Sequence, residues 1–293
     1  MYVRGSSLSL SDSIVSGHYE SGEDRAMDGA GVVGHGAMEE AMKPEEEWAL
    51  WQKWLGQEPK GDTLYAQVYE LLFFRQIWDG FAFIYGNAPE EAREEGTFLL
   101  WLRLSYARSL ALGVRRMADT RSDVLSLARL IDRVWRYPTI LTRERFLATQ
   151  NTVGEDLRLM SEGWYTSMAG EGDFIDPRIP AQDFEDLQAK TKQVRDWVNH
   201  SVAHLTAKGK PRAGIPLNAV HDAADVVADL FVKYNSLIQG VTIHSGVIMS
   251  YWPTIFRVPW IADDDQYRRV LDKLDEAERR RAEPPDPHPR FVG

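Results

Sequence analysis

The sequence predicts an all-α protein, an antiparallel helical bundle with short connections. Apolar residues recur at intervals of three or four over most of the chain, as in Leu64, Val68, Leu71 and Leu72. Capping residues and prolines stand where these runs begin. The sequence contains no alternating apolar and polar runs bounded by hairpin turns, no glycine-rich phosphate loop and no repeat of 20–50 residues.

Each expected helix follows from its own local pattern. Trp48, Trp51 and Leu55 stand at helical spacing in the first, Asp62 or Thr63 can cap the second, and Gly240 ends the sixth. The expected ranges are 45–55, 63–86, 97–119, 122–134, 181–205, 217–239 and, in the tail, 264–281. Residues 143–170 carry a weaker helical pattern.

Composition divides the chain into three parts. Residues 1–42 are rich in serine, glycine and acid without a sustained period, so we expect a disordered N-terminal segment. Residues 43–262 form the expected helical domain, and residues 263–293 a charged, proline-rich tail. Methionines at 1, 27, 38 and 42 all precede the first expected helix, which leaves the start of translation open among them.

The chain has 293 residues, no cysteine and a formal charge of −10. The missing cysteine excludes disulfides, thiolate zinc sites and cysteine nucleophiles, and it fits a cytoplasmic protein. The acidic charge disfavours non-specific nucleic-acid binding, so contact with RNA would require a local basic patch. No run of about 18 apolar residues predicts a membrane span.

The segment "RDWVNHSVAH", residues 195–204, raises the question of a metal site. His200 and His204 are four apart and share a helix face, which is the spacing of the first two ligands in HExxH zinc enzymes. Ser201 stands where those enzymes have glutamate, and the chain has no Glu-x-x-His motif. A metal would need His221 or His244 as a further ligand, so we predict no metal and no cofactor.

Metal-free phosphodiester chemistry is the second interpretation. One histidine would take the proton of a ribose 2′-hydroxyl and another would protonate the leaving oxygen. Arg195 would stabilise the developing charge, and Asn199 would position the phosphate. On a straight helix Arg195 and His204 point to opposite sides, so a kink or a second copy of the chain would be required. The alternative is an ordinary solvent-facing helix C-terminus, where the helix dipole favours histidine.

Two basic clusters are candidates for phosphate binding. Arg115 and Arg116 lie near the end of the helix expected over 97–119, close to Asp119 and Arg121. They either bind a phosphate or form a salt-bridged helix end. A second cluster follows His204 directly. It consists of Lys208, Lys210 and Arg212. A basic loop beside acid and base groups suits an RNA backbone.

The stretch "SYARSLALGVRRMADTRSDVLSLARLID", followed later by "VNHSVAH" and a basic loop with prolines, resembles the AbiU-type, abortive-infection branch of the HEPN superfamily. The resemblance covers about residues 64–260. It implies a helical bundle that dimerises and, in many members, a composite cleft with metal-independent RNase activity. His204 falls at the family's histidine and Asn199 at its polar position, whereas Val198 stands where many members have arginine. Arg195 and His200 satisfy the Arg-x4-His spacing in a shifted register.

Two functions follow as hypotheses. The first is a metal-independent ribonuclease of a toxin or abortive-infection system, with Arg195, Asn199, His200 and His204 as catalytic residues. The second is a non-catalytic helical module that binds RNA, a nucleotide or a partner protein. The loss of the arginine at Val198 favours the second hypothesis, and the histidines favour the first.

Overall fold

The structure is a computed structural model that describes residues 43–56, 63–88, 96–150, 155–202 and 214–240, together with residues 265, 266, 268, 269, 272, 273 and 276. The chain divides into two compact units, Met1–Ile248 and Met249–Gly293. The described residues of the second unit are helical, and Arg268 Nη1 lies 3.7 Å from Asp265 Oδ1. The expected disordered segment 1–42 and most of the tail lie outside the described residues.

The described part of the first unit is all-α, as predicted, and contains eight α-helices and no strand. The helices are α1 (Pro44–Leu55), α2 (Leu64–Gly86), α3 (Thr97–Met117), α4 (Leu127–Arg136), α5 (Arg143–Thr149), α6 (Glu155–Ala169), α7 (Arg178–Trp197) and α8 (Leu217–Gln239). A 3-10 turn, Pro138–Ile140, precedes α5, and a π turn, Val198–Val202, follows α7. None of these helices is both long and apolar enough to cross a membrane.

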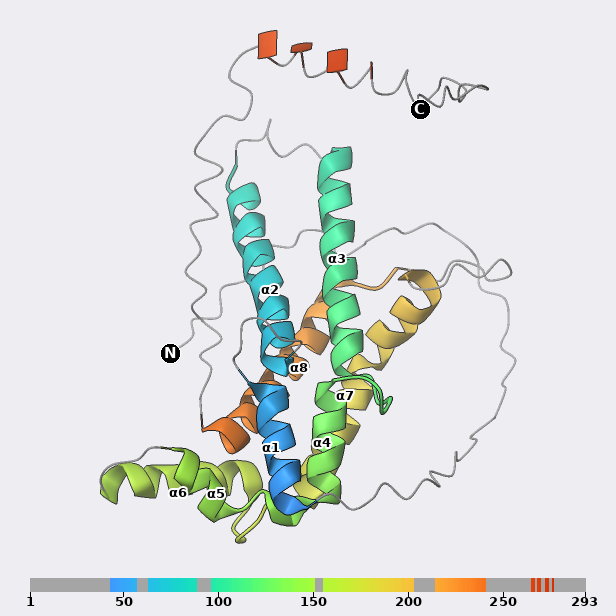
Figure 1. Ribbon diagram of the computed structural model, residues 1–293. Helices are drawn as coiled ribbons and strands as arrows, with labels where there is room; N and C mark the ends of the chain where they lie inside the picture. The colour runs from blue at the N-terminus through green and yellow to red at the C-terminus, as the bar shows by residue number, and fades with distance from the viewer. Residues whose placement is uncertain are drawn as a thin grey trace, which may run out of the picture. The chain divides into compact units, whose positions relative to one another are not determined.

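Helices α2 and α3 form a tall antiparallel pair (Figure 1). The lower half of α3 packs on α7 and α8, and α4 packs along α7. The short helices α5 and α6 contact each other and the C-terminal part of the bundle through α8. Helix α3 contacts both α7 and the π turn that follows it, and the candidate site lies at this contact.

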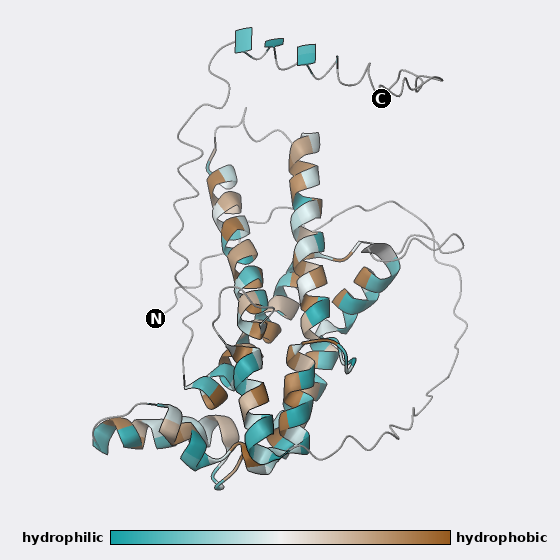
Figure 2. Ribbon diagram, viewed as in Figure 1, coloured by the Kyte–Doolittle hydropathy of each residue, from teal (hydrophilic) through white to brown (hydrophobic). Residues whose placement is uncertain are grey.

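The hydrophobic core is built by the helical spacing that the sequence displays. In α4 the side chains of Leu127, Leu130, Ile131 and Val134 are all 0% exposed, so one face of this helix is fully buried. Helix α8 contributes a similar stripe that includes Val220, Val227 and Tyr234. Figure 2 shows that hydrophobic residues also continue to the far ends of α2 and α3.

Two helix ends, the start of α2 and the end of α8, fall where capping residues predict them. Thr63 Oγ1 accepts a hydrogen bond from Ala66 N at 3.2 Å and caps α2, one of the two caps expected. Gly240 ends α8 with φ of +69°, in the left-handed region. A Cβ atom there would lie 2.7 Å from Thr149 O, so glycine is required both by conformation and by the approach of α5.

The prediction was wrong about the start of the fourth helix. The expected range began at Ser122, but α4 begins at Leu127 because Ser126 is the residue that caps it, with Oγ accepting from Arg129 N at 3.1 Å. The residues before Ser126 form a loop, in which Asp119 Oδ1 accepts from Arg121 N at 3.0 Å. The weak pattern over 143–170 corresponds to two helices, α5 and α6.

The helix expected over 181–205 begins earlier and changes its geometry before it ends. It starts at Arg178, with Pro180 in its first turn, and its α-helical part stops at Trp197. The π turn over Val198–Val202 is wider than an α turn, and such turns are frequent at functional sites. Side-chain directions counted along a straight helix therefore do not apply beyond Trp197.

Candidate functional site

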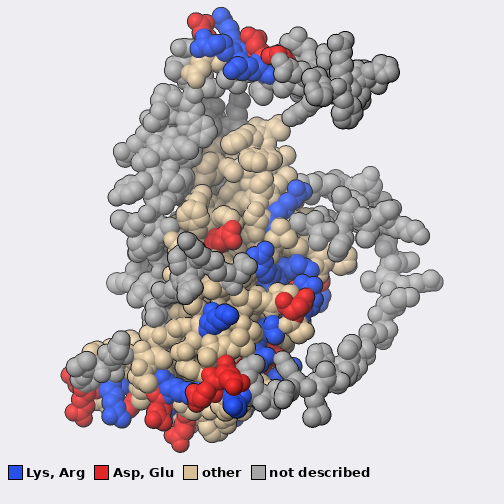
Figure 3. Space-filling model, in the orientation of Figure 1, with Lys and Arg blue, Asp and Glu red and all other residues tan. Residues whose placement is uncertain are grey.

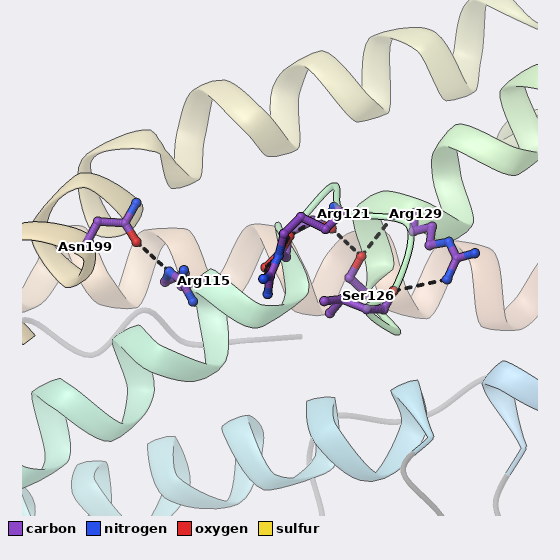
Figure 4. Close-up of polar contacts among 7 residues, drawn as sticks. Arg115, Arg121, Ser126, Arg129 and Asn199 are labelled. Atoms are coloured by element: carbon purple, nitrogen blue, oxygen red, sulfur yellow. Dashed lines mark hydrogen bonds and ion pairs between the residues drawn. The ribbon is translucent and has the colours of Figure 1, made fainter. Parts of the chain in front are cut away.

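The structure joins two residues that the sequence placed in separate clusters. Arg115, near the C-terminal end of α3, donates a hydrogen bond from Nε to Oδ1 of Asn199 at 2.6 Å, across 84 positions of the chain. Both residues are half-buried. Figure 4 shows this contact between the end of α3 and the turn after α7. An arginine thus lies beside Asn199 although the preceding position is Val198.

The burial of Val198 explains the direction of Asn199. Val198 is 0% exposed and belongs to the hydrophobic core together with Val194, one turn earlier. Because consecutive residues of a helical turn point in different directions, burying Val198 leaves Asn199 at the rim of the core, beside α3. An arginine at position 198 would have to enter the core, so the site takes its cation from α3 instead.

His200 lies at the solvent-exposed side of the same turn. Its Nδ1 is 2.7 Å from the carbonyl oxygen of Asp196. A carbonyl oxygen only accepts, so Nδ1 carries the hydrogen in this contact and the neutral ring presents the lone pair of Nε2. His200 therefore offers solvent a nitrogen that can take up a proton.

Arg195 is engaged elsewhere. Its Nη2 donates to the carbonyl oxygen of Gln188 at 2.8 Å, on its own helix. Its Nε has no hydrogen-bond partner within the described ranges, and the same residues show no hydrogen bond from Arg195 to Asn199 or His200. The remaining site predictions, His204, Lys208, Lys210 and Arg212, lie outside the described residues, as does His244.

The charges around Arg115 are partly compensated. Asp119 forms an ion pair with Arg121 at 3.0 Å. Burial raises the pKa of Asp119, but the hydrogen bonds and charge of Arg121 and the charge of Arg115 outweigh it and lower this pKa. Arg116 is exposed and forms no ion pair with any described residue. Figure 3 shows Lys and Arg side chains, with acidic side chains beside them, on the visible face near the C-terminal end of α3, and we call this group the basic patch.

Two residues that hold this region were missed from the sequence. Ser126 Oγ donates to the carbonyl oxygen of Asp119 while it caps α4, and Figure 4 shows it beside the loop. Gln188 Nε2 donates to the carbonyl oxygen of Ala118 at 3.0 Å and ties α7 to the end of α3. A serine before an apolar run is a recognisable cap signal, whereas a glutamine within a helix carries no signal for such a contact.

A cavity of about 490 Å³ opens beside the same loop. Its lining includes Arg121, Arg129, Arg133 and Arg136. Three of these arginines are paired with carboxylates, and the fourth, Arg129, donates to Val124 O and stands 5.0 Å over the ring of Trp54. The cavity is therefore balanced in charge and does not extend the basic patch.

His221, a possible third ligand in the metal interpretation, is engaged in a hydrogen bond. Its Nε2 lies 2.9 Å from the hydroxyl of Tyr106, between α3 and α8, and the ring of Tyr106 stacks on Trp78. Burial lowers the pKa of His221 to about 4, and the charge of Arg75 lowers it as well, while burial raises the pKa of Tyr106. Tyr106 is therefore the donor and neutral His221 the acceptor.

The lowered pKa of His221 leads us to expect that the stability of the protein depends on pH. The unfolded imidazole has a pKa of ~6.5, so between about pH 6.5 and 4 only the unfolded chain binds the proton, and stability falls as the pH falls. Allowing for solvent screening, we expect wild type to lose about 1 kcal/mol more than His221→Gln between about pH 7 and 5. Urea unfolding of both proteins at the two pH values measures this difference, and equal losses would contradict it.

The described residues contain no group of three or more His, Asp or Glu side chains arranged to hold a metal ion. A family model described as AbiU2, of the HEPN group, matches residues 70–248, which is more than half of the chain and includes Arg115, Asn199 and His200. No curated protein and no solved structure matches the chain.

Proposed function

Because this chain belongs to the AbiU2 family of HEPN proteins, we propose that it binds RNA and cleaves it without a metal ion, as part of a toxin or abortive-infection system. The observation that carries the proposal is the hydrogen bond from Arg115 to Asn199. This contact places an arginine beside Asn199, at the family's polar position. The residue directly before Asn199, where many members have arginine, is Val198 in this chain. His200, the residue directly after Asn199, exposes its imidazole to solvent.

In this proposal each residue has a distinct task. Arg115 binds a phosphate through its guanidinium and stabilises the charge that develops on phosphorus, while Asn199 orients Arg115. Arg116 adds a further positive charge for the neighbouring RNA backbone. Arg195 has no direct task in the free protein, because its Nη2 donates to the carbonyl oxygen of Gln188 on its own helix.

The chemical step is an attack of a ribose 2′-oxygen on the adjacent phosphorus. The 2′-hydroxyl proton passes to Nε2 of His200, the new P–O2′ bond forms and the P–O5′ bond breaks. The leaving 5′-oxygen takes a proton from a second acid, for which His204 remains the candidate from the sequence. The products are a 2′,3′-cyclic phosphate and a 5′-hydroxyl end.

The test is RNA cleavage by the full chain in EDTA. We expect wild type to release 2′,3′-cyclic phosphate ends. We expect His200→Ala to cleave at least about 100-fold more slowly. RNA with a 2′-deoxy residue at the cleavage site serves as the substrate control, and His221→Gln, outside the site, as the protein control. Undiminished cleavage by both His200→Ala and His204→Ala would overturn the catalytic proposal.

The second candidate function is RNA binding without cleavage. The specific observation that favours it is Val198, which is fully buried where many family members have arginine. In that case wild type binds RNA in a salt-dependent manner, Arg115→Met weakens binding, and no cyclic phosphate forms. The same assay with a binding measurement therefore separates the two functions.

A further inference from the structure

A small cavity lies between α2 and α3 and includes Arg116, the residue directly after Arg115, in its lining. Its volume is about 210 Å³. Figure 1 shows the two helices side by side. The lining residues that matter here are Gln67, Glu70 and Phe74 of α2 and Ser109, Leu112 and Arg116 of α3. Pockets for drug-sized ligands measure roughly 300–1,000 Å³, so this cavity suits a smaller group, such as a single planar ring system.

Two opposite charges line this cavity without pairing to each other. Glu70 and Arg116 are both exposed, and neither forms an ion pair within the described ranges. The Oε1 atom of Gln67 is shielded from solvent and accepts no hydrogen bond from a described residue. Buried polar atoms normally have a partner. The cavity therefore offers acceptors from α2 and a guanidinium donor from α3 to a ligand that carries both kinds of group.

Apolar side chains complete the lining. Phe74 is half-buried and packs against the core, and Leu112 is 44% exposed. Gly113 contributes no side chain, and a Cβ there would lie 2.2 Å from Cδ2 of Leu71, so glycine allows α2 and α3 to approach closely. Proteins that recognise single-stranded RNA bind the faces of its bases on aromatic side chains in this way.

Guanine matches both sets of polar groups. Its N1–H and N2–H groups are neighbouring donors, which one carboxylate can accept together, and its O6 and N7 atoms are acceptors that arginine binds in a bidentate manner. Adenine, cytosine and uracil present at most one donor group on the corresponding edge. A carboxylate from one helix and a guanidinium from the other therefore select guanine among the four bases of RNA.

We propose that the cavity binds a guanine base of RNA, with Glu70 accepting from N1 and N2, Arg116 donating to O6 and N7, and the ring lying against Phe74. This inference rests on the proposed function, because RNA brings the base to the site, and it adds base selection. Arg115 and Arg116 are consecutive on α3, so the phosphate at Arg115 and the base at Arg116 belong to one stretch of the same strand. Arg116 thereby has a second role beside its attraction for the RNA backbone.

Binding of short RNA strands to the full chain tests the proposal. Each strand is 2′-O-methylated to prevent cleavage and carries one guanosine, inosine or 7-deazaguanosine among uridines. Inosine lacks the N2 amino group, and 7-deazaguanosine lacks N7. We expect wild type to bind the guanosine strand about 10-fold more tightly than either analogue, as measured by fluorescence anisotropy.

Two variants assign each preference to its residue. Glu70→Ala should bind the guanosine and inosine strands equally. Arg116→Lys keeps the charge but loses the planar fork, so it should bind the guanosine and 7-deazaguanosine strands equally. The matched control is Glu185→Ala, which removes an exposed carboxylate from α7 and should keep both preferences. Ratios between strands are compared, because the loss of any negative charge strengthens RNA binding in general.

Equal binding of all three strands by wild type would overturn the proposal, and so would the same loss of preference in Glu185→Ala. Guanosine monophosphate alone should displace the guanosine strand only at about 100-fold higher concentration, because the strand also binds through its phosphates. Displacement at equal concentration would overturn the proposal in favour of a free nucleotide. RNA cleavage without preference for guanosine overturns this inference and leaves the proposed function intact. Guanosine-dependent binding without cleavage supports the inference and leaves only the second candidate function.

Discussion

Glu47→Met is expected to lower the free energy of unfolding by about 3–5 kcal/mol, because it leaves the guanidinium of Arg133 buried without its counter-ion. Glu47 on α1 and Arg133 on α4 are 1% and 6% exposed, and both carboxylate oxygens accept hydrogen bonds from Arg133. Trp51 Nε1 also donates to Glu47 Oε1, at 2.6 Å. The pair is therefore buried and fully hydrogen-bonded on the carboxylate side, which makes the removal of one partner costly.

The double variant Glu47→Met with Arg133→Met distinguishes this cause from a simple loss of packing. Removing both charges leaves no unpaired ion, so the double variant should be much less destabilised than the sum of the single variants. Urea unfolding measures all three proteins. The exposed ion pair of Arg158 and Glu162 is the control. Replacing either partner of this pair should lower the free energy of unfolding by less than about 1 kcal/mol. Additive losses in the buried pair would contradict the prediction.

Arg115→Met is expected to have the largest effect on activity. Under the proposed function, Arg115 stabilises the charge that develops on phosphorus, and removing such a donor typically lowers kcat by about 100- to 1,000-fold. Asn199→Ala should lower the rate less, because Asn199 positions Arg115 and does not itself carry charge. Adding the second substitution to Arg115→Met should then change little, since the two residues act as a unit.

Arg108→Met is the matched control for this prediction. Arg108 lies two turns earlier on α3 and is exposed, so its removal subtracts one positive charge from the same helix without touching Asn199. Its rate should fall only through weaker general attraction of RNA, and this loss should diminish at high salt. If Arg108→Met and Arg115→Met reduce cleavage equally, Arg115 has no special role and the patch acts as a uniform basic surface.

The sequence was sufficient for the fold class and for most helix boundaries. Apolar spacing located the buried stripes of α3, α4 and α8, and Thr63 and Gly240 marked the ends where they occur. The fourth helix was misplaced at its start because Ser122 and Ser126 are both acceptable caps. In the structure Ser126 caps α4 and Leu127 after it is fully buried, which leaves Asp119 in the loop before the helix.

The candidate site could be predicted only in pieces. Arg115 and Asn199 were each recognised as candidates, one as a phosphate ligand and the other as a polar positioner. Their pairing could not be read from the chain, since 84 residues separate them and no local rule connects α3 with the end of α7. The role of Arg195 as charge stabiliser stays a prediction, and the structure shows its Nη2 donating to the carbonyl oxygen of Gln188.

The sequence by itself determined that this protein is helical and which residue types were available for chemistry at the end of α7. The tertiary structure decided which cation lies at Asn199. The physical reason is the burial of Val198 in the core at the point where α7 widens into a π turn. That burial excludes a charged residue at position 198 and turns Asn199 toward α3, where the packing of α3 against α7 places Arg115 within hydrogen-bonding distance.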